Sequence, residues 1–158
     1  MATKPYKKSL FIFRRDLRLD DNTGLIEAVN QSEKVIPLFN FAPDQVGSKN
    51  EYRSRNAIQF MVESLQDLED QLKKKGGRLY LFYGELEKNL EKIFKDQEID
   101  AVFLNYDYTP YAMKRDGMIK KLCAKHKIAF QAYHDELLIG DPRSIMTGSG
   151  TPYSVYTP

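Results

Sequence analysis

Short apolar runs alternate with longer stretches of helical periodicity along most of this chain. The first run, Leu10 to Phe13, is too short to cross a membrane and is typical of a buried strand. A polar turn follows it, and Leu25, Ile26 and Val29 then predict the apolar face of a helix. Strand, polar turn and helix form the first half of a βαβ unit. Ligands of such units bind beyond the carboxyl ends of the strands, so the turn is a candidate site.

The same alternation continues to residue 133. Four further segments, 34–41, 78–83, 101–104 and 128–133, are mostly apolar and β-prone, which predicts strands. Pro37 removes a backbone donor from the second strand and favours an edge position or a local bulge there. No hairpin signal joins any two neighbouring strands. The pattern therefore predicts an α/β fold, a doubly wound five-stranded parallel sheet flanked by helices in the Rossmann-like manner.

The segments between the later strands have helical periodicity and recognisable ends. The clearest helix has Ser54 as its expected N-cap, and Gly76 and Gly77 end it. Its core-facing stripe is Ile58, Met61, Leu65, Leu68 and Leu72, with Phe60 beside it. A shorter helix is expected from about residue 85, and another begins at Thr109-Pro110. The connection 42–53 is longer than a structural turn needs, which favours a functional loop.

Composition indicates an ordinary soluble domain. The chain has 158 residues, 42% of them hydrophobic and 29% charged, and its net charge of +2 gives no argument for a nucleic-acid binder. Cys123 is the only cysteine, so it fits a reducing compartment or a small buried side chain. The first residues have the pattern of neither a signal peptide nor a membrane anchor. We therefore expect a cytoplasmic protein, or a nuclear one in a eukaryote.

The common catalytic and phosphate-binding motifs are missing. The sequence has no GxGxxG, no GxxxxGK[ST], no HExxH, no CxxC and no GxSxG. Its two histidines, His126 and His134, lack the spacing of metal ligands. These absences argue against a P-loop enzyme, a metal site and a serine hydrolase, and no catalytic residue is predicted.

Three stretches remain as candidates, each with two interpretations. The charged turn 14–22 either binds an anionic or planar ligand or pairs its own charges as a solvated turn and helix cap. The segment 105–111 follows a strand and is rich in tyrosine, which suits a stacked heterocycle but equally a core or an interface. The basic residues of 73–78 and 120–127 suit nucleic acid or, as we favour, solvated helix ends. From the residues alone, this is a binding fold of unknown ligand.

A resemblance to one family rests on four blocks in the same order. The first is FIFRRDLRLDDN, which is similar to the FRxDLRxxDN opening of the DNA photolyase and cryptochrome family. The next are SRNAIQFMVESLQDLEDQLKKKGGRLYLFYGE and NYDYTPYAMKRD, which resemble the family's later helix and strand blocks. The last is TGSGTPYSVYTP, which resembles the segment that crosses to the family's helical domain. Together the blocks span nearly the whole chain.

The resemblance implies a domain of a longer light-dependent protein. Residues 1–134 would be the N-terminal α/β domain, which carries an antenna chromophore, and residues 135–158 would begin the interdomain linker. A helical C-terminal domain beyond this chain would hold FAD and bind UV-damaged DNA, in a protein expected to be a monomer. The full-length protein would be a photolyase, which splits pyrimidine dimers by electron transfer from reduced FAD, or else a cryptochrome, a blue-light receptor. By itself the chain is not expected to repair DNA.

The resemblance also implies where the antenna chromophore binds. The family's cleft uses the loop after the first strand, the end of the second strand and the block after the fourth. The residues at these places are Arg14, Arg15, Asp16, Asn40, Phe41, Asp107 and Tyr108. A folate is held in the family by an Asn-Glu pair where this chain has Tyr111 and Ala112, which argues against folate and leaves a deazaflavin, a flavin or no antenna. Arg18, Asp20 and Asn22 are expected to lock the turn and cap the helix.

Overall fold

The predicted alternation of strands and helices is present in the structure, a computed structural model that describes residues 4–48, 50–137, 139 and 144–153. The elements of this part, in chain order, are β1 (Tyr6–Phe13), α1 (Thr23–Gln31), β2 (Ser32–Phe41), α2 (Pro43–Val46), α3 (Arg55–Lys74), β3 (Tyr80–Tyr83), α4 (Leu86–Asp96), β4 (Ala101–Asn105), α5 (Pro110–Lys125) and β5 (Ala129–Tyr133). The predicted N-caps are confirmed, since Ser54 caps α3 and Thr109 caps α5 through side-chain hydrogen bonds.

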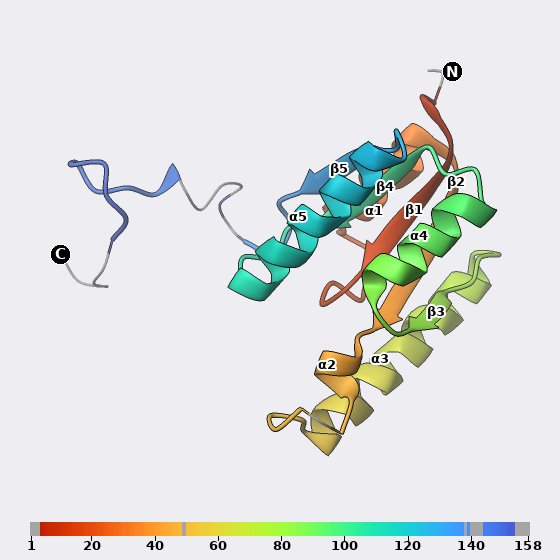
Figure 1. The fold of residues 1–158 in the computed structure, drawn as a ribbon, viewed down its shortest axis with the longest axis horizontal. Coiled ribbons are helices and arrows are strands. Elements are labelled where there is room, and N and C mark those ends of the chain that lie inside the picture. Colours follow the sequence, from red (N-terminus) through yellow and green to blue (C-terminus); the bar gives the residue numbers. More distant parts are fainter. Residues whose placement is uncertain (1–3, 49, 138, 140–143, 154–158) are drawn as a thin grey trace.

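The strands form one parallel sheet with β1 at its centre (Figure 1). The order of the five strands in the described chain is β3-β2-β1-β4-β5, and each neighbouring pair is parallel. The predicted doubly wound sheet is therefore confirmed. The chain winds outward from β1 to β3 and then outward on the other side from β4 to β5. The carboxyl ends of β1 and β4 thus flank the point where the winding reverses, where open α/β sheets bind ligands.

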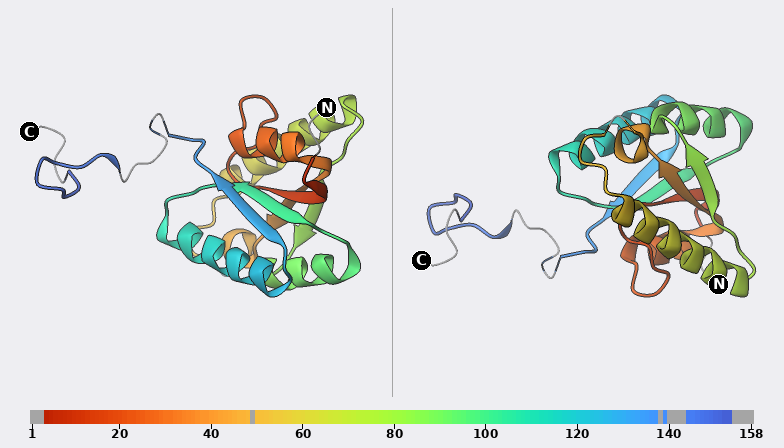
Figure 2. Two further views of the ribbon diagram at one scale, coloured as in Figure 1. Left: turned by 90° about the horizontal axis from the view of Figure 1, so that it is seen from above. Right: turned by 90° about the horizontal axis from the view of Figure 1, so that it is seen from below.

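Two hydrophobic cores cover the two faces of the sheet, because successive strand residues point to opposite faces. Leu10 and Ile12 of β1 pack with apolar residues of α4 and α5. Phe11 and Phe13 belong to the opposite core, with residues of α1 and α3. Figure 2 shows the helices in these two layers. β4 and the segment of β1 from Ser9 to Phe13 are wholly buried, as expected for central strands of a parallel sheet.

Two predicted helix faces are only partly correct. Phe60 was expected beside the core stripe of α3 but is 73% exposed. The first half of α3 extends past the carboxyl ends of the strands (Figure 1), so only Leu65, Leu68 and Leu72 are buried. In α1, the buried row contains Gly24, Leu25 and Ala28, whereas Ile26 and Val29 are exposed. Gly24 and Ala28 are small, so the helix lies close to the sheet on that side. The prediction from periodicity chose the larger apolar residues Ile26 and Val29 as the buried face.

Pro37 was expected at an edge position or a local bulge, and the structure has no bulge there but leaves one side of Pro37 without a paired strand. β2 lies between β1 and β3, and its register with β1 is continuous across Pro37, which pairs with Phe11. Pairing with β3 begins only at Leu38, opposite Tyr80. At Pro37 the strand therefore has a paired neighbour on the β1 side alone, and a proline is tolerated there.

No span of the lipid bilayer is indicated by the helices of the described residues, because each falls short of the required length or apolar character.

Candidate functional site

A cleft of about 790 Å³ opens at the carboxyl end of the sheet. Its floor includes Phe13 and Arg14 after β1 and Asn40 of β2. One wall is formed by α2 and the start of α3, and the other by the first turns of α5. The volume lies within the range of about 300–1,000 Å³ that is usual for small-molecule sites. This cleft is the candidate site, at the place that the strand–turn–helix pattern predicted.

Arg14 lies in the first turn after β1 and lines the cleft, and a local hydrogen bond fixes the backbone of this turn. The backbone N–H of Arg14 donates to Oδ1 of Asp16 at 2.8 Å. The Arg14 guanidinium pairs with Oδ1 of Asp116 on α5, and both side chains are about nine-tenths buried. Arg115 donates to the same Asp116 oxygen through Nε, at 3.3 Å. Two arginines therefore share one carboxylate oxygen at the wall of the cleft.

Asp107 lies between the arginines of the cleft. Its Oδ1 accepts from the backbone N–H of Thr109 at 3.2 Å. Its Oδ2 is 3.8 Å from Nε of Arg15 and 4.0 Å from Nη2 of Arg115. Burial alone raises the pKa of Asp107, but the Thr109 N–H and the charges of Arg15, Arg115 and Arg14 outweigh burial and hold that pKa below its ordinary value. Asp107 is therefore a carboxylate at neutral pH and balances part of the positive charge.

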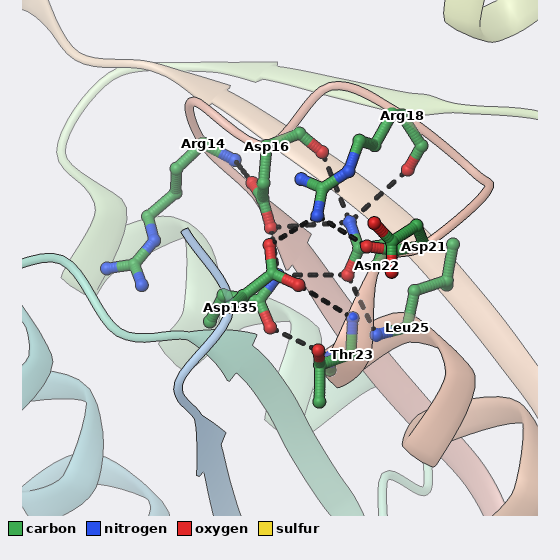
Figure 3. Close-up of polar contacts among 10 residues, drawn as sticks. Arg14, Asp16, Arg18, Asp21, Asn22, Thr23, Leu25 and Asp135 are labelled. Atoms are coloured by element: carbon green, nitrogen blue, oxygen red, sulfur yellow. Dashed lines mark hydrogen bonds and ion pairs between the residues drawn. The ribbon is translucent and has the colours of Figure 1, made fainter. Parts of the chain in front are cut away.

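Asp16 is turned into a buried polar network rather than into the main cleft (Figure 3). Its Oδ2 accepts from the side-chain amide of Asn105 at 2.6 Å. That amide also donates to Oδ1 of Asn22, which caps α1 by accepting from the N–H of Leu25. Asp16 instead lines a much smaller depression beside the cleft. Its contacts hold the turn in shape, and the predicted capping role of Asn22 is confirmed.

The end of β5 is hydrogen-bonded to the same turn. Asp135 follows β5, and its Oδ1 accepts from the N–H of Thr23 at 2.8 Å (Figure 3). Its Oδ2 accepts from Nη2 of Arg18, which also donates to the carbonyl of Asp21. The predicted locking role of Arg18 is thereby confirmed. The turn after β1, the start of α1 and the end of β5 form one hydrogen-bonded unit.

The remaining expected residues divide between the cleft and its surroundings. Asn40 lines the cleft, and its side chain donates to the carbonyl of Gly84 and accepts from Asn89. Phe41 lies outside the cleft lining, and its ring is 5.0 Å from that of Phe39. Tyr108 is also outside the lining, with its hydroxyl 2.7 Å from Nδ1 of His134. The structure therefore brings Arg14, Arg15, Asn40 and Asp107 together at the cleft and leaves Asp16, Phe41 and Tyr108 outside it.

Several cleft residues lie beyond the candidate segment 105–111 and were not selected from the sequence. Lys114, Arg115 and Met118 line the wall formed by α5, together with Tyr111 of that segment. They lie three and four positions apart, which places them on one face of a helix. That spacing follows directly after the candidate segment 105–111 and was the available signal. The α2–α3 wall had only a weaker signal, the length of the connection 42–53.

A parallel α/β domain with a ligand-sized cleft at its topological switch point has the architecture in which α/β proteins bind small molecules. The family model for DNA photolyase matches residues 9–158, so the chain belongs to the DNA photolyase family. The resemblance drawn from the sequence blocks is therefore confirmed.

Individual relatives support the same assignment. The chain is 36% identical to a deoxyribodipyrimidine photo-lyase of Synechococcus sp., over 94% of this chain and 30% of that protein. It is 31% identical to Cryptochrome-1 of Aedes aegypti, over 91% of this chain and 27% of that protein. The chain thus spans about a third or less of the length of these relatives.

Solved structures have the same fold. An archaeal photolyase from Sulfolobus tokodaii, described with two FAD molecules, is 46% identical with a TM-score of 0.81, and the match covers 89% of this chain and 32% of that one. A class III photolyase from Agrobacterium tumefaciens is 29% identical with a TM-score of 0.84, over 99% of this chain and 31% of that one. The fold of this chain is that of the photolyase N-terminal domain.

Proposed function

We propose that this chain is the light-harvesting domain of a DNA photolyase and that its cleft holds the antenna chromophore. The observation that carries the proposal is the cleft of about 790 Å³ at the switch point of a sheet that belongs to this family. Apolar residues such as Phe13, Met61 and Met118 line it together with arginines and an amide. Such a lining suits a planar, polar-edged heterocycle.

The construction of the cleft suits energy transfer rather than bond chemistry. Energy transfer needs a chromophore held at a fixed distance and orientation. The floor of the cleft is held by hydrogen bonds between residues far apart in sequence, including Asn40 with Asn89 and Asp16 with Asn105. These contacts keep Arg14 and Asn40 in place without any need for a ligand.

A flavin is the chromophore that we propose. The Sulfolobus tokodaii photolyase, at 46% identity, is described with two FAD molecules and with the implication of a novel light-harvesting cofactor. Folate is disfavoured because Tyr111 and Ala112 stand where folate-binding members of the family have an Asn-Glu pair. A deazaflavin is the alternative, since its ring system has a similar shape.

The roles of the longer protein form part of the proposal. Residues 135–158 would begin the linker that leads to a C-terminal helical domain, which would hold the catalytic FAD and bind UV-damaged DNA. Light energy collected here would pass to that FAD, whose electron splits a pyrimidine dimer. We propose a monomeric protein of the cytoplasm. The alternative, a cryptochrome, rests on the similarity to Cryptochrome-1 of Aedes aegypti, whereas the relatives with higher identity include photolyases. Dimer repair by the full-length protein under blue light distinguishes the two.

Absorption and fluorescence spectra of the purified chain test the antenna role. The chain is titrated with FAD, a deazaflavin and a folate, and we expect saturable binding of the flavin. Ala57 is exposed and lines the cleft, so Ala57→Trp should obstruct it and weaken binding strongly. Ala124 is equally exposed on a helix but away from the cleft, so Ala124→Trp is the matched control. Equal binding by both variants, or no binding of any of the three chromophores, contradicts the proposal.

A further inference from the structure

The cleft wall contains a charge cluster whose hydrogen bonds are incomplete. Arg14 and Arg115 are only 10% and 15% exposed, and both line the cleft. Within the described residues, Nη2 of each guanidinium is buried and has no hydrogen-bond partner. A buried donor without a partner destabilises the fold, and more so when it is charged. Oδ2 of Asp116 is likewise buried without a partner, so two donors and one acceptor of this cluster lack hydrogen bonds within the described residues.

The charges around the two arginines are close to balance. Arg14, Arg15, Lys114 and Arg115 are cationic, and the ion-pair partners of the three arginines are Asp107 and Asp116. Asp16 and Glu136 adjoin Arg14 and Arg15 in the neighbouring depression, so the formal sum is zero when both are ionised. Burial raises the pKa of Glu136, and the nearby Asp16 and Asp107 raise it further, although Arg15 lowers it. The unpartnered guanidinium nitrogens, rather than an excess of positive charge, therefore provide the place for an anion.

The surroundings of Arg115 disfavour its positive charge. Burial lowers the pKa of Arg115, and the adjacent charge of Arg14 lowers it further, although Asp116 and Asp107 act in the opposite direction. An added anion would offset the repulsion between the two guanidiniums. Planar guanidinium groups bind phosphate oxygens through paired hydrogen bonds, and arginine is the residue best suited to that geometry.

The other charged residues of the cleft lining are Asp44, Arg53, Glu85 and Glu87. Asp44 lies in α2, Arg53 precedes α3, and Glu85 and Glu87 lie at the start of α4. The unpartnered guanidinium nitrogens of Arg14 and Arg115 therefore favour a bound anion beside α5, which leaves the rest of the cleft for the ring system of the ligand.

We propose that Arg14 and Arg115 bind the phosphate of a flavin nucleotide, so that the cleft selects FMN or FAD over riboflavin and other unphosphorylated chromophores. This inference rests on the proposed antenna function and adds to it the chemical class of the ligand. A neutral deazaflavin without phosphate leaves the two guanidiniums unsatisfied and is bound more weakly.

Equilibrium dialysis of the chain against riboflavin, FMN, FAD and inorganic pyrophosphate tests the proposal. We expect FMN and FAD to bind about 10- to 100-fold more tightly than riboflavin, the effect of one or two charge-assisted hydrogen bonds. Arg115→Gln should remove most of that preference, because it should lower the affinity for FMN and FAD more than the affinity for riboflavin. Arg115→Lys retains the buried charge but lacks the paired donors, so it should keep the fold and lose the larger part of the preference.

Lys120→Gln is the matched control, because Lys120 is exposed on the same helix and does not line the cleft. Thermal unfolding of each variant shows whether the fold is retained. Pyrophosphate should compete with FAD for binding and should not compete with riboflavin. Raised salt should weaken the binding of FAD more than the binding of riboflavin.

The outcomes separate this inference from the proposed function. If riboflavin binds as tightly as FMN, the phosphate site is wrong and the antenna role stands. The phosphate site is also wrong if Arg115→Lys and Arg115→Gln both fold and lower the affinities for riboflavin and FMN equally. If pyrophosphate binds in an Arg115-dependent way but no flavin binds, the anion site stands and the flavin antenna does not. If neither pyrophosphate nor any flavin binds, both proposals are wrong.

Discussion

The side-chain amide of Asn105 donates a hydrogen bond of 2.6 Å to Oδ2 of Asp16, a residue 89 positions earlier in the chain. Asn105 ends β4, and Asp16 lies in the turn that follows β1. The same side chain accepts from the N–H of Gly24 at 2.8 Å and donates to Asn22 at 2.9 Å. One buried amide thus joins the central strands and the start of α1, and it holds the turn that carries Arg14 into the cleft.

Replacing that amide should destabilise the whole domain. Asn105→Leu has a similar volume but leaves the buried Asp16 and the N–H of Gly24 without their partner. We expect the free energy of unfolding to fall by about 3 kcal/mol, because a buried polar group loses both its hydrogen bond and its solvation. Urea unfolding followed by circular dichroism measures the change. Asn30 is exposed on α1, and Asn30→Leu should change stability by less than about 0.5 kcal/mol. Equal effects of the two substitutions contradict this account.

Gly24 is required by the close approach of α1 to Asn105. A Cβ at this position would lie 2.5 Å from Oδ1 of Asn105 and 3.1 Å from the carbonyl of Leu104. Gly24→Ala should therefore cost about 1–3 kcal/mol of stability, as for other overpacked sites. Gly117 lies within α5 with nothing within 4 Å of such a Cβ, so Gly117→Ala should stabilise by about 0.5–1 kcal/mol. Denaturant midpoints measure both, and a destabilised Gly117→Ala protein argues against this explanation.

The fold could be predicted from local sequence patterns, because burial explains the apolar runs and capping explains the residues at the helix starts. Apolar runs such as Leu10 to Phe13 predicted buried strands, and capping residues such as Ser54 and Thr109 marked the helix starts. Burial within a helix was harder, since it depends on where the helix ends relative to the sheet. Phe60 has a core-like spacing, but it lies on the part of α3 that extends past the strands.

The site was predictable only where it follows strand ends. Arg14, Asn40 and Asp107 come at or just after the ends of β1, β2 and β4, and parallel strands bring those ends to one edge. Asp16 is two residues from Arg14, yet its carboxylate turns toward Asn105. The direction of that side chain depends on a partner 89 residues away, so no local pattern contains it. Arg115 enters the cleft through the rotation of α5, which tertiary packing sets.

The contact of Asp135 with the α1 end should make stability depend on acid pH. Its side chain is only 1% exposed. Burial raises the pKa of Asp135, but hydrogen bonds from Thr23 and Arg18 outweigh burial and lower that pKa below its ordinary value. A carboxyl whose folded pKa is depressed stabilises the fold above its unfolded pKa, which is about 3.9. That contribution is lost as pH falls from there through the folded pKa.

Asp135→Asn removes the titrating group at this contact and keeps its shape. At pH 7 we expect the variant to be less stable than the unmodified chain by about 1–3 kcal/mol, through loss of a charge-assisted contact. The difference should shrink as the pH is lowered from about 5 to below the folded pKa, because the wild-type carboxyl is then protonated as well. Urea unfolding at a series of pH values measures it. A difference that stays constant from pH 7 to pH 3 contradicts the role of this carboxylate.

Cys123 should be unreactive in the folded chain and reactive in the unfolded one. It is fully buried in the core under α5, and burial raises the pKa of its thiol to about 12. Because the thiolate is the nucleophile, alkylation by iodoacetamide at neutral pH should occur only through unfolding. Labelling in urea should then follow the same midpoint as circular dichroism. Cys123→Ala combined with Ala124→Cys moves the thiol by one position to an exposed site and should be labelled at once without urea. Rapid labelling of Cys123 in the native chain would mean that the α5 face of the core opens far more readily than its packing implies.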